Sequence, residues 1–299
     1  MKSVTLTVIA NITSNYGESL GNVTSVQKVF KKGKTYATRS RESLKNAIMV
    51  ESGLYDDLEI TVDSKVAQKV VSEELNATNC RALEGGYMNT KVGKDGRTCI
   101  RNSSIYLTDA ISCEPFVLES RFHNNLHSAT TFAKANNLNV QNDSKGENKV
   151  GLMPYNYEYD KNMKIYSLTI DLTKVGKDEN FNTEADNKEK CERVIAVLNA
   201  VESLNLVVKG NLDNAEPLFV IGGLSDRMTH QFENVVSVHG GKLKITPDLK
   251  NRLAKGYKAA LLEGENFENE FEIMKELNTI SVSEFFDNLR SEVKAYYEV

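Results

Sequence analysis

The residues with the clearest chemical potential are the cations and hydroxyls between Lys28 and Lys45. Seven cations against the single acid Glu42 leave an excess of six positive charges in this stretch. Ser40 is expected to cap an amphipathic helix that begins directly after it. Free amides at a helix start, arginine side chains and serine hydroxyls are groups that bind phosphate. The stretch therefore predicts a phosphate site, and the alternative is an ordinary amphipathic helix with a basic rim.

Three neighbouring segments must position these groups. Residues 4–13 alternate apolar with mostly polar side chains, which fits a half-buried strand whose polar face is free to meet a ligand. Residues 15–22 contain two glycines and two asparagines, and this composition predicts a loop. Residues 31–34 carry the positive charge into a basic ribbon. A solvated helix face does not explain that ribbon, so the phosphate interpretation is favoured.

A metal site is the second chemical possibility. His123 and His127 have the i, i+4 spacing that lets two imidazoles on a helix share a metal, but Asn124 stands where the metalloprotease pattern requires Glu. The four cysteines are widely spaced and fit no standard zinc ribbon or finger. We expect them to be reduced, small buried hydrophobes. The sequence therefore predicts no metal and no cofactor, with a zinc site from these His and Cys residues left as an alternative.

The overall charge of the chain is a poor guide to its partners. The 299 residues carry a net charge of −4 and a pI near 5.8, which argues against nucleic-acid binding through the field of the whole protein. Residues 263–299, however, hold ten acids against three cations, so an acidic tail conceals the local basic stretch. Because no apolar run approaches the roughly 20 residues that cross a bilayer, we expect a cytoplasmic protein without membrane contact.

The order of predicted elements indicates an α+β fold. Strand, helix, strand and a later repeat of this order predict a ferredoxin-like or RRM-like core in a single domain. The long stretches between these elements are expected to be inserted segments, at about residues 53–127 and 136–162, and residues 246–299 a helical C-terminal extension. The aromatic RRM signature is absent, so base stacking on the sheet is not supported. Tyrosines occupy the alternate positions Tyr155, Tyr157 and Tyr159. They could stack bases, or they could form a ladder of side chains on one face of a strand.

Further local patterns bear on the site. Residues 66–75 have helical spacing, and the strongest helical pattern begins at Thr183. Gly222 and Gly223 end a predicted strand and precede Arg227. Such a glycine pair allows the backbone to lie against a phosphodiester, although a plain turn explains it equally well.

Several stretches together resemble the DevR-type backbone subunits of type I-B CRISPR Cascade complexes, which belong to the RAMP superfamily. The first are residues 3–11 (SVTLTVIAN) and 38–48 (TRSRESLKNAI). Others are residues 101–105 (RNSSI), 121–125 (RFHNN), 208–211 (VKGN) and 219–223 (FVIGG). The resemblance runs along nearly the whole chain and is far more specific than any single motif.

The resemblance implies a non-catalytic protein whose copies assemble side by side along a CRISPR RNA. Each copy would hold the RNA backbone and leave the bases to pair with target DNA. The implied partners are other copies of the chain, the large and small Cascade subunits, the subunit that binds the 5′ handle and the endonuclease that processes the CRISPR RNA. The candidate RNA-binding residues are Asn15, Arg39, Ser40, Arg41, Ser43, Lys45 and Asn46, followed by Arg101, Arg121, His123, Gly222, Gly223 and Arg227.

Two rival functions follow from the same resemblance. Related backbone subunits of type III complexes cleave RNA with an acid in the loop after the first strand, whereas residues 13–27 here contain only Glu18. A lone carboxylate is weak equipment for metal-assisted cleavage. A DNA-binding regulator would show a helix-turn-helix or a dimer with symmetric half-sites, and the sequence shows neither pattern.

Overall fold

Two paired long strands form the centre of the protein. The computed structural model describes residues 2–20, 23–63, 65–92, 96–138, 152 and 154–299. Strands β1 (Ser3–Thr13) and β14 (Lys161–Asp171) run antiparallel, with Ser3 opposite Asp171 and Thr13 opposite Lys161. The remaining strands of this sheet are β4 (Lys28–Lys31), β5 (Lys34–Arg39), β10 (Ile105–Leu107), β11 (Ala110–Ser112), β19 (Phe219–Ser225) and β22 (Lys258–Leu261).

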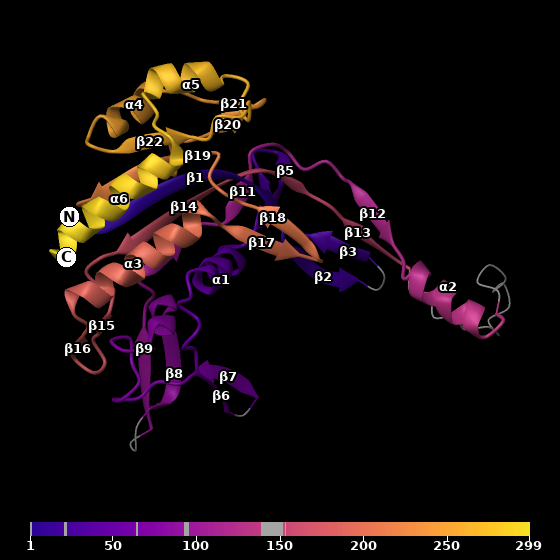
Figure 1. Cartoon of the computed structure of the whole chain (residues 1–299), viewed down its shortest axis with the longest axis horizontal. Coiled ribbons are helices and arrows are strands. Elements are labelled where there is room, and N and C mark those ends of the chain that lie inside the picture. The colour runs from indigo at the N-terminus through magenta and orange to yellow at the C-terminus, as the bar shows by residue number, and fades with distance from the viewer. Residues whose placement is uncertain (1, 21–22, 64, 93–95, 139–151, 153) are drawn as a thin grey trace.

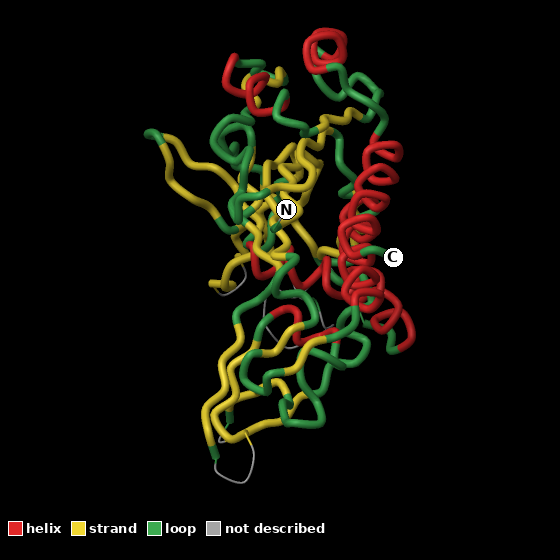
Figure 2. Tube along the Cα trace, turned by 90° about the vertical axis from the view of Figure 1, so that its left-hand side faces the viewer, coloured by secondary structure: helices red, strands yellow, loops and turns green. Residues whose placement is uncertain are grey.

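The sheet order is β22-β19-β1-β14-β11-β5-β4, with β10 also paired to β14. Helix α1 (Arg41–Glu51) follows β5, and α3 (Asn187–Glu202) lies between β14 and β19 in the chain. Together with α6 (Val282–Tyr297), these helices lie on one side of the strands (Figure 1 and Figure 2). The predicted α+β class is confirmed.

Strand β1 is buried on both faces. Its alternate apolar residues Val4, Leu6 and Val8 pack in one buried cluster with α1, α3 and α6. On the other face Ile9 joins a second cluster, with residues of α4 (Pro247–Leu253) and α5 (Glu270–Leu277). This double burial makes β1 the element on which both layers of the protein depend.

The prediction of an open polar face on β1 is wrong. The side chains of Thr5 and Thr7 are fully buried. Thr5 Oγ1 donates to the carbonyl oxygen of Thr229 at 3.1 Å, and Thr7 Oγ1 lies 2.7 Å from Ser167 Oγ. A later part of the chain covers this face, and its backbone and side chains satisfy the hydroxyl groups.

The predicted first insert, 53–127, is divided by the structure. Strands β6 (Ile60–Asp63), β7 (Val66–Lys69), β8 (Tyr87–Val92) and β9 (Arg97–Arg101) and the 3₁₀ helix η1 (Arg81–Gly85) form a subdomain below the sheet in Figure 1. This subdomain has its own small apolar cluster. Strands β10 and β11 then return to the central sheet beside β14. The helix predicted for residues 66–75 is wrong, because β7 instead pairs with β6 in a hairpin.

A second sheet extends to the right in Figure 1. Its order is β12-β13-β3-β2, and helix α2 (Leu126–Ala135) continues from it. The strands are β2 (Tyr16–Leu20), β3 (Val23–Val26), β12 (Ser120–His123) and β13 (Tyr155–Glu158). The loop predicted at residues 15–22 is therefore wrong over β2, which pairs with β3. Much of the predicted insert 136–162 lies outside the described residues.

Short hairpins complete the fold. These are β15 (Lys177–Asp178) with β16 (Thr183–Glu184), β17 (Asn205–Val208) with β18 (Asn211–Asn214), and β20 (Val238–His239) with β21 (Lys242–Leu243). The pairing of β15 with β16 displaces the predicted start of α3 from Thr183 to Asn187, with Asp186 as the N-cap. Within the described ranges, none of the helices is long and apolar enough to cross a membrane. Cys80, Cys99, Cys113 and Cys191 are all free and buried, as predicted.

Candidate nucleic-acid interface

Arg39 is a buried arginine with few partners. It is the last residue of β5 and only 6% exposed. Its Nη1 donates to the carbonyl oxygen of Thr13 at 3.3 Å, while Arg39 Nε and Thr13 Oγ1 have no hydrogen-bond partner in the described structure. Burial lowers the pKa of Arg39, and nearby Asp213 opposes this shift. A buried guanidinium so poorly bonded is unfavourable unless an anion or water completes its contacts.

Two acids at the carboxyl end of β1 are already engaged by other groups. Asp213 accepts from the backbone amide of Thr13 at 2.9 Å and from Lys161 Nζ at 3.1 Å. Asp160 lies 2.6 Å from the fully buried Lys164 Nζ. Among the described residues Arg39 has no ion pair. The carboxyl end of β1 thus combines an under-bonded cation with satisfied carboxylates, an arrangement suited to an added anion.

Asn15 and Ser40 adjoin this position. The side-chain oxygen of Asn15 accepts from the backbone amide of Ser40 at 2.8 Å. Ser40 in turn caps α1, because its hydroxyl accepts from the amide of Ser43 at 3.3 Å. The predicted cap is confirmed, and the structure brings Asn15, Arg39 and Ser40 together.

Two of the free amides expected at the start of α1 are occupied. The backbone amide of Arg41 donates to Asp109 Oδ1 at 2.8 Å, and Ser43 donates to the capping hydroxyl. The amides of Arg41 and Ser43 are therefore not free to hold a phosphate. Asp109 comes from the segment between β10 and β11, and no local pattern links it to α1. Arg41 itself is exposed and bonded through Nε to Glu42 at 2.8 Å, and Asn46 is also exposed.

Lys45 points into the protein instead of joining Arg41 on the surface. Its Nζ donates to the carbonyl oxygen of Gly85 at 3.0 Å and to Ser103 Oγ at 2.6 Å. Burial lowers the pKa of Lys45 to about 8, and the positive charges of Lys69 and Arg101 add to this effect. Arg39, Arg41 and Lys45 therefore do not line one continuous exposed channel.

The lowered pKa of Lys45 predicts a specific pH dependence of stability. Between the folded-state pKa of about 8 and the ordinary value of 10.5, the unfolded chain binds more protons than the folded one. Stability consequently rises with pH across this window, because the cost of burying a charged amine disappears. Denaturant unfolding of wild type and Lys45→Met should show the wild type gaining stability relative to the variant from pH 8 upward. The exposed Lys275→Met is the control, and a difference that stays flat for Lys45→Met would contradict the assignment.

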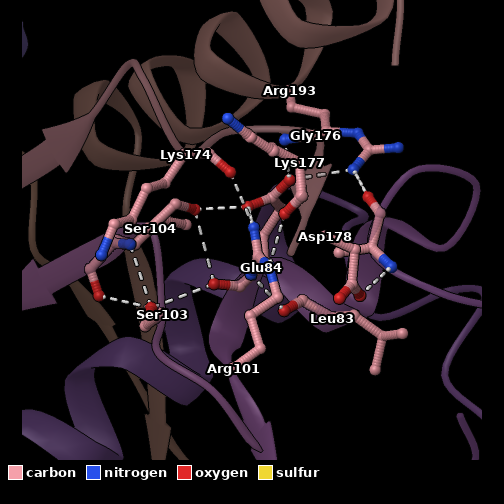
Figure 3. A network of polar contacts seen from close by, with 12 residues as sticks. Leu83, Glu84, Arg101, Ser103, Ser104, Lys174, Gly176, Lys177, Asp178 and Arg193 are labelled. Carbon is pink, nitrogen blue, oxygen red and sulfur yellow. Dashed lines mark hydrogen bonds and ion pairs between the residues drawn. The ribbon is translucent and has the colours of Figure 1, made fainter. Parts of the chain in front are cut away.

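Arg101 belongs to a buried network that joins the β6–β9 subdomain to the core (Figure 3). Its guanidinium donates to the carbonyl oxygens of Leu83, Lys174 and Lys177 at 2.8–2.9 Å and pairs with Glu84 at 3.0 Å. Because all three nitrogens of this guanidinium are bonded to these groups, we leave Arg101 out of the proposed interface. The buried position of Glu84 could not be predicted from the sequence, because a single acid in a glycine-rich stretch gives no sign that it is buried.

Glu84 also binds Arg193 of α3. Its Oε1 lies 2.9 Å from Arg193 Nη1 and accepts from the backbone amide of Gly176 at 2.6 Å. Glu84 and Arg193 are each about 1% exposed. One carboxylate therefore holds two arginines from separate parts of the chain.

Gly222 and Gly223 lie inside β19 and not at its end. Both are buried, and Gly222 pairs directly with Leu6 of β1. A Cβ on Gly222 would lie 2.0 Å from the carbonyl oxygen of Thr5. The glycine therefore permits close approach of two strands, and neither glycine is open to a phosphodiester.

Arg227 is exposed but distant from Arg39. Its carbonyl oxygen accepts from Ser3 Oγ at 2.7 Å, at the opposite end of β1 from Thr13. Since a strand rises about 3.3 Å per residue, the two ends of β1 that these arginines contact, Ser3 and Thr13, lie roughly 33 Å apart. Arg121 and His123 are exposed at a third location, on β12 of the second sheet. The predicted residues thus occupy several separate places.

The predicted basic ribbon is a β-hairpin. Strands β4 and β5 are joined by Lys32 and Gly33, whose φ angles are +50° and +77°. Lys31, Lys32 and Lys34 are exposed, and Phe30 is 74% exposed. Lys28 of this hairpin forms an ion pair with Glu158 of β13. The hairpin therefore adjoins the second sheet.

The zinc alternative gains no support from the coordinates. Among the residues that the structure describes, no group of three or more His, Cys, Asp or Glu side chains is arranged to hold a metal.

Comparisons with known proteins point to one family. The family model described as "CRISPR-associated negative auto-regulator DevR/Csa2" matches residues 4–239. A chain of a solved "CRISPR RNA-guided surveillance complex" is similar with a TM-score of 0.55 and 15% identity, over 97% of this chain and 99% of that one. A chain of a "CRISPR RNA-guided surveillance complex, pre-nicking" gives 0.54 and 14%, over 88% and 93%. Among curated proteins no sequence matches significantly.

Proposed function

Because the chain belongs to the CRISPR-associated DevR/Csa2 family, we propose that it is a non-catalytic subunit that binds CRISPR RNA and forms the backbone of a type I-B surveillance complex. In this proposal copies lie side by side along the RNA in a helical filament in the cytoplasm and leave the bases free to pair with target DNA. The other partners are the large and small subunits, the 5′-handle-binding subunit and the processing endonuclease.

The burial of Arg39 without a full set of hydrogen-bond partners is the observation that supports the RNA-binding part of the proposal. A buried guanidinium with an unbonded Nε is stabilised by an anionic phosphate oxygen, since charge-assisted hydrogen bonds are the strong ones. Contacts of this kind position a nucleic acid without reading its sequence. We place Asn15 and Ser40 in the same contact, and the half-buried Ser43 and the exposed Arg41 and Asn46 beside it. Arg121, His123 and Arg227 extend the interface to further segments of the RNA.

Replacing Arg39 by Met separates this role from a structural one. Removing a poorly bonded buried charge is expected to leave the free energy of unfolding unchanged within about 1 kcal/mol, or to raise it. The same change should weaken binding of single-stranded RNA by about tenfold or more, because a hydrogen bond to a charged group contributes about 1.5–3 kcal/mol. Fluorescence anisotropy with two RNAs of unrelated sequence, and thermal unfolding of the RNA-free protein, measure the two effects.

Two comparison variants sharpen this test. Arg193→Met removes an equally buried arginine whose partners are complete, so it should clearly lower the melting temperature. Lys275→Met removes an exposed cation on α5 and should leave RNA affinity unchanged. Arg39→Met with full RNA affinity would reject the assigned contact. Wild-type protein that fails to bind either RNA would reject the proposed function.

A DNA-binding regulator is the second candidate, because the matching family is described as a negative auto-regulator. The same anisotropy measurement with duplex DNA distinguishes the two. We expect tighter binding of single-stranded RNA at equal salt, whereas preference for one duplex sequence would favour the regulator.

A further inference from the structure

The second sheet carries an aromatic and cationic face that includes Arg121 and His123 of the proposed interface. On β12, Arg121 lies opposite Tyr157 and His123 opposite Tyr155. The imidazole of His123 and the ring of Tyr155 have centroids 4.9 Å apart, and the Arg121 guanidinium carbon lies 3.4 Å from the ring centroid of Tyr159. Residues two apart on a strand point to the same face. The guanidinium of Arg121 and the imidazole of His123 therefore lie side by side, each packed against a tyrosine ring.

Lys209 holds the inner part of this face in place. It lies in the tight turn between β17 and β18, and its Nζ is 4.7 Å, 5.4 Å and 5.6 Å from the ring centroids of Tyr16, Tyr155 and Tyr157. An ammonium within about 6 Å of a ring is attracted to its π face. Burial raises the pKa of Tyr16 to about 12, with neighbouring Tyr157 adding to the shift, so the Tyr16 hydroxyl remains neutral. The three tyrosine rings therefore pack around the positively charged amine of Lys209.

This face is not part of a hydrophobic core. None of Tyr16, Tyr155, Tyr157 and Tyr159 belongs to the buried apolar clusters found among the described residues. The Arg121 side chain is 47% exposed, its one ion pair among the described residues is the 3.4 Å contact to the exposed Glu119, and His123 is exposed as well. A tyrosine ladder that only stabilised strand pairing would not need a guanidinium and an imidazole laid over its outer edge.

We propose that Arg121 and His123, supported by Tyr159 and Tyr155, form a stacking surface for bases of single-stranded RNA. Arginine planes and aromatic rings are the groups on which unpaired bases stack. The two groups are about 7 Å apart along β12, so each presents its own surface to a base. Lys209 and Arg121 supply positive charge for the adjoining phosphates. This inference rests on the proposed RNA-binding function and adds contact to the bases beside β12, while the other bases stay free to pair with target DNA.

The test compares a base-bearing strand with one that has no bases. Full-length protein is titrated with a labelled oligoadenylate and with an abasic oligoribonucleotide of equal length at fixed salt. We expect the wild type to bind the oligoadenylate about tenfold more tightly, since stacking contributes on the order of 1–3 kcal/mol per base. Arg121→Lys with His123→Ala keeps the arginine's charge but removes both planes. It should abolish that preference, whereas binding of the abasic strand should fall by much less.

The chain offers a matched control pair. Arg97 also lies over an aromatic ring, 5.3 Å from the centroid of Phe181, and His239 is another exposed histidine. Arg97→Lys with His239→Ala should therefore keep the preference for oligoadenylate.

Each remaining outcome has a definite meaning. Equal wild-type affinity for both strands, or an equal loss for both in the Arg121/His123 variant, overturns the stacking surface while the backbone function stands. Loss of self-association of the RNA-free variant with RNA affinity intact would assign the face to another copy of the chain and overturn the proposal. Binding of neither strand by wild type would reject the backbone function itself.

Discussion

Replacing Glu84 by Gln is expected to lower the free energy of unfolding by about 3–5 kcal/mol. The carboxylate accepts from Arg101, Arg193, Ser104 and the amide of Gly176, all in a buried environment. An amide of the same shape leaves two buried guanidinium groups without a counter-charge, and the cost of that imbalance exceeds the loss of any one hydrogen bond. Urea unfolding followed by circular dichroism measures the change.

Glu192 provides the matched control for Glu84. It also binds an arginine, Arg81, at 2.9 Å, but its side chain is 49% exposed. Exposed ion pairs contribute little, so Glu192→Gln should change stability by less than about 1 kcal/mol. If the two variants lost equal stability, burial of the Glu84 network would not be the cause.

Gly222→Ala is expected to destabilise the protein by about 3 kcal/mol or more, beyond the usual cost of overpacking. The added methyl group would meet the backbone oxygen of Thr5 at 2.0 Å and the side chain of Leu6 at 2.9 Å. Backbone in the middle of a doubly buried strand has no room to move. Thermal unfolding should show the loss directly.

Gly17→Ala is the corresponding control. A Cβ there would lie 3.7 Å from the carbonyl oxygen of Ser25, which is ordinary contact, so the melting temperature should change little. A stable Gly222→Ala protein that binds RNA poorly would show instead that this glycine serves a ligand and not the packing of β19 on β1.

Local features of this fold were predictable from the sequence because their causes are local. Ser40 and Thr246 cap helices through bonds to amides three residues later, and Pro247 stands at a position where no amide hydrogen is needed. The basic ribbon at residues 31–34 was likewise visible from composition. The strand β14 and the helical pattern of α3 follow from their apolar periodicity.

The errors concern partners that lie far away in the sequence. The threonines of β1 look like a solvent-facing edge, yet they are fully buried: Thr5 bonds to the backbone of Thr229, and Thr7 to Ser167 of the neighbouring strand β14. Lys45 looks like part of a basic surface, yet its amine bonds to Gly85 and Ser103 from the inserted subdomain. Alternation and charge reveal which residues share a face, but not which distant segment lies on that face. The free surface of Arg39 was misjudged for the same reason.

The place of α6 in the core has a consequence for how the chain is made. Phe285, Phe286 and Leu289 of this last helix complete the cluster that begins with Val4 of the first strand. Tyr297 also donates its hydroxyl to the carbonyl oxygen of Leu172 at 2.9 Å. During synthesis this apolar cluster therefore stays incomplete until residues 282–297 have left the ribosome. Contacts so distant in sequence slow folding. The intermediate in which this cluster is still incomplete is the state most in need of a chaperone.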